Sequence, residues 1–320
     1  MRTPQKKVYL FEGMSPKGHV QLTKYYKNTF GESSTLYVGI SLKSHYKKEV
    51  DVNYYNDFFG LKNKYFSIFS FLFYSLLMII KCKKNNGKCL VFLSYNANVM
   101  FLVTWIAILF NVRILCFEHN TVPKPSESNL KKIAQRLCSK KLLRICYMPA
   151  VVELYEKLGQ RAVYIPHPII NVEVSCNPVN YSKSYKYKVF CPSAQGKISK
   201  VKSLAENNKN VLFIVKCKEP VSIDNIVSER FFDNYYDIMY ACDFVYLPVE
   251  FDCRVSGPFY EAIGFNKKVL VEPCGFSEYV SHEFQGMVVN NFEKSTNEDC
   301  FNVDFYNKKI RSSLEVAING

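Results

Sequence analysis

The sequence predicts an α/β protein of two domains, each with a parallel sheet covered by helices, and three observations lead to this class. Short apolar runs alternate with longer amphipathic or polar segments through both halves of the chain. No two runs are joined as a tight hairpin. The length of 320 residues is sufficient for two separate cores. Alternation without hairpins is typical of parallel sheets between helices.

Apolar runs mark the expected strands of the first half. The strands are expected at residues 6–11, 35–40, 89–94, 113–117, 143–148 and 162–165, and the helices at 65–80, 99–110, 129–141 and 150–158. Residues 12–19 (EGMSPKGH) form a Gly-containing loop after the first strand, where backbone can approach a ligand closely. A plain strand-to-helix connection is the alternative for this loop.

The second half follows a polar stretch, residues 171–186, which we expect to be the interdomain linker. Its strands are expected at 187–191, 211–215, 243–247 and 268–271, and its helices at 231–240, from about Pro258, and at 307–316. We therefore place an N-terminal domain at 1–170 and a C-terminal domain at 187–320. Whether the final helix packs back on the first domain stays open.

The composition indicates a globular protein with an anionic partner. Apolar residues make up 48% and charged residues 22%, with a formal net charge of +14. Nucleic acid, anionic lipid headgroups and a nucleotide diphosphate are the candidate partners. The basic residues lie in short clusters without a recognisable nucleic-acid module, so we expect an anionic membrane surface and no nucleic acid. A merely solvated basic surface is the alternative.

The twelve cysteines do not suggest a disulfide framework. Several lie in apolar strand patterns, and no pair has the CxxC spacing of a zinc site. No signal peptide pattern precedes the first strand. We therefore expect reduced, buried thiols, no metal site and a cytoplasmic protein.

Residues 65–80 (YFSIFSFLFYSLLMII) form the most hydrophobic run of the chain. Its sixteen residues fall short of the roughly 20 that span a bilayer. We expect either a core helix of the first domain or an interfacial helix, with Lys81, Lys83 and Lys84 at the headgroups. The second alternative predicts peripheral attachment to the inner face of the cell membrane.

The stretch from Tyr240 to Tyr279 carries the main chemical signal. It reads as a strand, a polar loop with Arg254, Ser256 and Gly257, a helix with Glu261, a second strand and a Gly-containing turn ending in Glu278. Backbone N–H groups at a helix start attract anions, Arg254 can donate to phosphate oxygens, and Glu261 can accept from a sugar diol. Ordinary loop and capping residues would give the same pattern.

Two further places offer polar groups after apolar strands. His119 follows the strand expected at 113–117, where parallel sheets present functional side chains, although a loop histidine with local partners is the alternative. Lys197 and Lys200 lie in a basic, Gly-containing loop at 192–202, after the first strand of the second domain. A solvated lysine-rich loop would look the same.

These residues resemble the nucleotide-sugar-binding segment of the group 1 GT-B glycosyltransferases, which are retaining and similar to family 4. The matching pieces are Leu247-Pro248, the acidic Glu250 and Asp252, Glu261-Ala262, Gly264, Val269 to Val271, and Gly275 to Glu278. One position departs from the pattern. The family commonly has a second Glu eight positions before this Glu, and here that position is Cys253. Asp252 or Glu250 could replace it.

The resemblance implies two Rossmann-like domains facing an interdomain cleft, with an acceptor-side first domain and a donor-binding second domain. It implies a metal-independent, hexosyltransferase-like enzyme without a cofactor, which moves a sugar from a nucleotide diphosphate sugar to a lipid-linked or polysaccharide acceptor. His119 would lie near the donor sugar as the catalytic candidate, and Gly18 and His19 would contact the acceptor. The donor contacts would be Lys197, Lys200, Arg254, Ser256, Gly257 and Glu261. An epimerase acting on the nucleotide sugar, or a non-catalytic scaffold with this fold, is the alternative.

Overall fold

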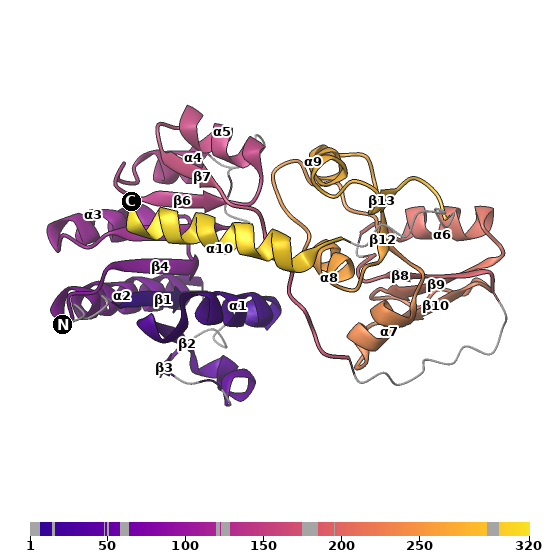
Figure 1. Ribbon diagram of the computed structural model, residues 1–320, viewed down its shortest axis with the longest axis horizontal. Helices are drawn as coiled ribbons and strands as arrows, with labels where there is room; N and C mark the ends of the chain where they lie inside the picture. The colour runs from indigo at the N-terminus through magenta and orange to yellow at the C-terminus, as the bar shows by residue number, and fades with distance from the viewer. Residues whose placement is uncertain are drawn as a thin grey trace. The chain divides into compact units, whose positions relative to one another are not determined.

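The computed structural model describes residues 7–14, 17–47, 49, 51–57, 64–119, 122, 129–174, 185–194, 196–292 and 301–320. The chain divides into two compact units. Unit 1 comprises Met1–Pro166 together with Lys309–Gly320, and unit 2 comprises His167–Lys308. Each unit has its own parallel sheet with helices, as Figure 1 shows.

Unit 1 contains a seven-stranded parallel sheet. Its strands are β1 (Val8–Glu12), β2 (Ser34–Gly39), β3 (Val52–Tyr55), β4 (Cys89–Ser94), β5 (Ile114–Glu118), β6 (Leu143–Cys146) and β7 (Arg161–Tyr164). Their order is β3-β2-β1-β4-β5-β6-β7. The chain therefore builds outward from β1 in one direction and from β4 in the other. The carboxyl ends of β1 and β4 meet at this topological switch point, where open α/β sheets bind ligands.

Helices cover the sheet of unit 1. They are α1 (Val20–Phe30), α2 (Lys64–Lys84), α3 (Met100–Leu109), α4 (Asn129–Arg136) and α5 (Pro149–Lys157), with short 3-10 helices at Lys17–His19, Gly31–Ser33 and Ile40–Tyr46. Buried side chains of α2 and α3 join those of β1, β2, β4 and β5 in one apolar cluster. The two helices thus cover the same face of the sheet. The last helix, α10 (Val303–Asn319), begins in unit 2 and ends in unit 1.

Unit 2 contains a six-stranded parallel sheet with the order β10-β9-β8-β11-β12-β13. The strands are β8 (Tyr187–Cys191), β9 (Val211–Lys216), β10 (Ile226–Glu229), β11 (Phe244–Leu247), β12 (Lys268–Val271) and β13 (Val288–Val289). The helices are α6 (Ile198–Asn207), α7 (Tyr235–Ala241), α8 (Gly257–Gly264) and α9 (Gly275–Glu283). Here the switch point lies between β8 and β11, so α6 and α8 both begin beside it.

The prediction of two α/β domains with parallel sheets is confirmed, because every strand pair in both units is parallel. The expected cleft between the domains stays a prediction. Three strands were missed in the sequence, namely β3, β10 and β13. All three are edge strands with partly exposed residues, so they lack the continuous apolar run that marks a central strand.

The expected length of the hydrophobic helix was wrong. It includes the lysines after residue 80 and has 21 residues, because lysine continues a helix readily. By length and composition alone α2 could therefore cross a membrane. Its buried side, however, includes Phe71, Ile79 and Cys82 in the core of unit 1.

Two expected loops are partly helical. Lys200 lies in the first turn of α6 and not in a loop, and Lys197 is the residue that precedes this helix. The turn expected to end at Glu278 is the start of α9. Ten of the residues expected to form the linker, 175–184, lie outside the described part of the chain.

Candidate functional site

Two lysines and two carboxylates form an ion-pair cluster at the switch point of unit 2. Lys197 Nζ lies 2.5 Å from Glu250 Oε2, and Lys200 Nζ lies 2.8 Å from Glu250 Oε1. Lys200 Nζ also lies 2.6 Å from Glu272 Oε2. The lysines come from the start of α6, and the carboxylates follow β11 and β12. Parallel strands bring these segments to one edge of the sheet.

The cluster favours the charged forms of Glu250, Glu272 and Lys200. Hydrogen bonds from Lys197 and Lys200 lower the pKa of Glu250 to about 2. Hydrogen bonds to Glu250 and Glu272 raise the pKa of Lys200 to about 12. Tyr246, in β11, also donates to Glu272. The side chains remain partly exposed, so another anion in solution can compete for the lysines.

The loop before α8 contains the other predicted phosphate ligands. Ser256 is buried and precedes α8 without capping it through its side chain. In the first turn Pro258 has no N–H and the N–H of Phe259 donates to the Ser256 carbonyl at 3.1 Å, which leaves the N–H of Gly257 as a donor for an anion. A side chain at Gly257 would meet open space, so this position is accessible from outside. Arg254 lies over the ring of Phe251, 4.7 Å from its centroid. Burial lowers the pKa of Arg254.

The hydrogen-bond partners of Glu261 are tyrosines and not the lysines of the cluster. In the described part of the chain it accepts from Tyr235 (2.9 Å) and Tyr236 (3.4 Å), both at the start of α7. Burial raises its pKa, against the effect of the two tyrosine hydrogen bonds. The structure thus fixes this carboxylate between α7 and α8, and a diol ligand would have to share it with the tyrosines.

The acidic residues that could replace the family's second Glu have structural partners. Asp252 Oδ1 accepts from the backbone N–H of Gly275 at the start of α9, at 3.3 Å. A Cβ atom on Gly275 would come within 3.0 Å of the Asp252 carbonyl, which accounts for the glycine. Glu250 belongs to the lysine cluster described above. Cys253 is partly buried, and burial raises its pKa.

In unit 1 the structure brings His19 and His119 together. Their ring centroids are 4.4 Å apart, and the ring of His119 lies 5.1 Å from that of Tyr147. His19 ends the short helix before α1, and His119 follows β5. Both are partly exposed, so a ligand can reach them. Gly18 is exposed, and a side chain there would meet nothing.

A buried carboxyl, Glu12, ends β1 at the switch point of unit 1. It accepts hydrogen bonds from Ser94 at the end of β4 and from Thr23 in α1, the latter at 3.0 Å. Burial raises the pKa of Glu12 to about 8. In this loop Gly13 is the glycine that is closely packed, because a Cβ atom added there would lie 2.7 Å from the ring of Phe71. Gly18, the predicted residue, has no such constraint.

A second buried network holds β5, the strand that precedes His119. Glu118 and Arg144 form a fully buried ion pair with 2.6 Å between Arg144 Nη1 and Glu118 Oε1. Tyr95 and Tyr155 also donate to Glu118, and Gln135 accepts from Arg144 at 2.6 Å. Buried charges that are paired and hydrogen-bonded in this way fix the backbone next to them. The network therefore holds the end of β5.

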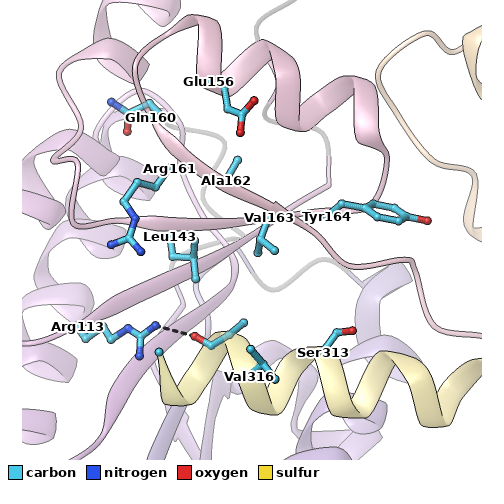
Figure 2. Close-up of a pocket in the computed structure, with 12 residues that line it drawn as sticks. Arg113, Leu143, Glu156, Gln160, Arg161, Ala162, Val163, Tyr164, Ser313 and Val316 are labelled. Atoms are coloured by element: carbon cyan, nitrogen blue, oxygen red, sulfur yellow. Dashed lines mark hydrogen bonds between the residues drawn. The ribbon is translucent and has the colours of Figure 1, made fainter.

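A cavity of about 670 Å³ lies elsewhere in unit 1, along edge strand β7. Figure 2 shows Val163 pointing from β7 toward α10, and Arg113 reaching the last turns of that helix. Arg113 donates to the carbonyls of Ala317 (2.7 Å) and Ile318 (2.8 Å). None of the site residues predicted from the sequence lines this cavity.

The described residues contain no group of three or more side chains placed to bind a metal. Ten cysteines in the described part of the chain are free, and eight of them are buried. Burial raises the pKa of several, including Cys89 and Cys191 to about 12, so these thiols stay protonated and unreactive.

Several residues around both switch points were missed in the sequence. They are Glu272, Tyr246, Tyr235 and Tyr236 in unit 2, and Glu12, Ser94 and Tyr147 in unit 1. Glu12 and Glu272 had a usable signal, because each stands at the carboxyl end of an apolar run. The tyrosines had none, since aromatic residues in strands and helices usually belong to the core.

Comparison with solved structures identifies the architecture as GT-B. No protein-family profile matches the sequence, and no curated protein is similar to it at a significant level. HepE of Anabaena in complex with UDP-glucose superposes with a TM-score of 0.64 at 13% identity, over 97% of this chain and 99% of that one.

Two other GT-B structures differ in activity. The lipopolysaccharide outer core galactosyltransferase WaaB has a TM-score of 0.54 at 11% identity, over 84% of this chain and 81% of its own. The UDP-GlcNAc 2-epimerase of Neisseria meningitidis bound to UDP-GlcNAc has the same TM-score at 12% identity, over 98% and 91%. At these identities the likeness establishes the fold alone.

Proposed function

We propose that this protein is a glycosyltransferase that uses a nucleotide diphosphate sugar. The observation that carries the proposal is the pair Lys197 and Lys200 at the switch point of unit 2, in a fold shared with proteins solved with UDP-sugars. A transferred sugar leaves a diphosphate behind, and positive charge already in place stabilises that leaving group. Unit 2 is then the donor-binding domain and unit 1 the acceptor domain.

When the donor binds, its diphosphate replaces Glu250 and Glu272 as the partner of Lys197 and Lys200. Glu250 and Glu272 occupy the lysines in the present structure. The diphosphate of a nucleotide sugar offers the same lysines an equal negative charge on one group, and the departing nucleoside diphosphate carries more. The N–H of Gly257 at the start of α8, the hydroxyl of Ser256 and the guanidinium of Arg254 add donors on the same edge of the sheet. Glu261, held by two tyrosines, accepts from the ribose.

His119 is the catalytic candidate, and Gly18 and His19 belong to the acceptor side. Support comes from the contact between the two imidazole rings at the carboxyl edge of unit 1. The proposed reaction is retaining and needs neither a metal nor a cofactor, as the resemblance of residues 240–279 implies. The proposed acceptor is a lipid-linked or polysaccharide intermediate, and the proposed location is the cytoplasmic face of the cell membrane.

An epimerase is the second candidate, because an epimerase bound to UDP-GlcNAc shares the fold at the same TM-score as the galactosyltransferase. The two candidates differ in their need for an acceptor. An epimerase converts a nucleotide sugar without one, whereas a transferase releases the nucleotide only when an acceptor or water receives the sugar.

The test combines a nucleotide-sugar screen with variants of the lysine cluster. We expect UDP or another nucleoside diphosphate to bind in titration calorimetry, and Lys197→Gln with Lys200→Gln to weaken binding by about 10-fold or more. Lys202→Gln, an exposed lysine of the same helix, is the matched control. Equal affinity of the double variant and the wild type would contradict the donor site.

The same screen separates the activities. Nucleotide release that depends on an added glycan or lipid-linked acceptor supports the transferase, and the anomeric configuration of the product by NMR shows whether the reaction retains it. His119→Ala should abolish release while leaving nucleotide affinity unchanged. Isomerised nucleotide sugar without acceptor would establish the epimerase instead.

A further inference from the structure

Helix α2 exposes a continuous apolar stripe. Its members are spaced three or four residues apart, so they lie on one side of the helix: Phe66, Phe69, Phe73, Leu77 and Ile80. Each is between 39% and 67% exposed. Five large apolar side chains along one exposed helix face exceed the scattered apolar residues of an ordinary surface.

Helices α3 and α4 extend this surface. The exposed side chains are Leu102, Trp105 and Leu109 of α3, Ile133 of α4, and Leu137 directly after α4. Helix α3 packs beside α2 over the same core cluster. Trp105 Nε1 donates to the carbonyl of Leu137 at 2.9 Å, which joins α3 to the end of α4. We call these ten residues, on three neighbouring helices and the residue after α4, the apolar platform.

Helix α2 cannot leave the core of unit 1 to span a membrane. The other side of α2 carries Phe71, Ser75 and Ile79, which are at most 2% exposed, in the interior of unit 1. Extracting α2 would expose this side and open the core of the unit, at a large cost in stability. The helix therefore stays on the sheet, and only its outer side chains are available to a partner.

The charge around the apolar platform indicates which kind of partner it binds. The sequences of α2, α3 and α4 contain no Asp or Glu. Exposed lysines stand at the end of α2 and just after α4, namely Lys81, Lys83, Lys84, Lys140 and Lys141. Such a surface is complementary to anionic lipid headgroups. A second copy of the chain docked on the same surface would bring lysines against lysines.

We propose that the apolar platform binds the surface of an anionic bilayer. The ten side chains enter the headgroup and upper acyl region, Trp105 lies at the interface, and the lysines contact lipid phosphates. The biological reason for this docking rests on the proposed function, since a lipid-linked acceptor lies in such a membrane. The binding itself depends on unit 1 alone and needs no donor, acceptor or turnover.

Trp105 is the only tryptophan of the chain, so its fluorescence reports the platform directly. Vesicles of phosphatidylcholine with about one third phosphatidylglycerol should shift its emission to the blue and protect it from acrylamide. Acyl-brominated lipids should quench it. Pure phosphatidylcholine vesicles should bind far more weakly, and added salt should reduce binding, because surface charges are screened over about 10 Å at 0.1 M salt.

Matched variants test both parts of the surface. Phe69→Ser with Phe73→Ser should reduce vesicle binding at least 10-fold, whereas Phe231→Ser with Phe305→Ser, residues of unit 2 that are at least as exposed, should not. Lys83→Gln with Lys84→Gln should reduce it by about fivefold per lysine. Lys202→Gln with Lys209→Gln is the charge-matched control. All of these side chains are exposed, so the variants fold.

Three outcomes would overturn the proposal. They are an unchanged Trp105 spectrum with anionic vesicles, equal binding to neutral and anionic vesicles, and a dimer in solution that the Phe69 and Phe73 variant dissolves. Failure of the proposed transferase activity would look different. In that case the vesicle results would stand while the nucleotide titrations failed.

Discussion

At the residue scale, burial sets the chemistry of Glu12. This carboxyl lies at the end of β1 with hydrogen bonds from Ser94 and Thr23, and its pKa is raised by burial to about 8. In the unfolded chain the same group ionises near pH 4.5. Between these two values the folded protein binds more protons than the unfolded chain. The free energy of unfolding therefore decreases as the pH rises from about 4.5 to about 8.

Glu12→Gln should remove this pH dependence, because glutamine has the shape of the protonated acid and does not ionise. We expect wild type and variant to differ little at pH 5 and the variant to be more stable at pH 8, by a few kcal/mol. Denaturant unfolding at several pH values measures this difference. Glu32→Gln, an exposed carboxyl of the same unit, is the control. If the free energies of unfolding of wild type and variant differ by a constant amount from pH 5 to pH 8, the raised pKa of Glu12 is refuted.

At the element scale, α10 is packed at both of its ends. Near its start, the side chain of Asn307 accepts from the N–H of Ile169 (3.1 Å) and donates to its carbonyl (2.7 Å), within unit 2. Near its end, Arg113 donates to Ala317 and Ile318 within unit 1. A guanidinium at these carbonyls satisfies acceptors that the helix cannot pair itself, and it complements the helix dipole.

Arg113→Gln should loosen the last turns of α10. Loss of the charged hydrogen bonds should cost about 1–3 kcal/mol and increase amide hydrogen exchange in residues 314–319. Mass spectrometry of exchanged peptides measures it. Arg161→Gln replaces an exposed arginine at the same cavity and should leave this exchange unchanged. If exchange in α10 does not respond to Arg113→Gln, the carbonyl contacts do not anchor the helix.

At the scale of the whole molecule, each unit has its own sheet and core, so each can respond to a ligand separately. The proposed function assigns the donor to unit 2 and the acceptor and membrane to unit 1. A ligand stabilises the part of a protein that it binds, by about 2.7 kcal/mol at 100 times its dissociation constant.

Saturating UDP should therefore slow amide exchange in unit 2, first at the starts of α6 and α8. Anionic vesicles should slow it in α2 and α3 of unit 1. Exchange measured with each ligand alone and with both together tests the assignment. Protection by UDP that appears in β1, β4 and β5 but not in unit 2 would reverse the proposed roles of the two units.

The sequence by itself determined the central part of each sheet. The bounds expected for β4, β8 and β12 agree with the structure to the residue, because each is a compact, mainly apolar run bounded by polar or turn residues. Glu261 was also placed on the correct helix, since Pro258 and the apolar run after it mark a helix start. The edge strands β3, β10 and β13 were missed, because their partly exposed segments have no such run, whereas the edge strand β7 was predicted.

Only the tertiary structure decided what the polar residues do. Lys197 and Lys200 read as a solvated loop or as phosphate ligands, and the structure pairs them with Glu250 and Glu272, 53 and 72 positions further along the chain. In the same way it buries Glu12 and leaves Trp105 exposed. Local patterns record how much of a segment is buried. Which charges meet depends on the order of strands in the sheet, and that order follows from the packing of the whole unit.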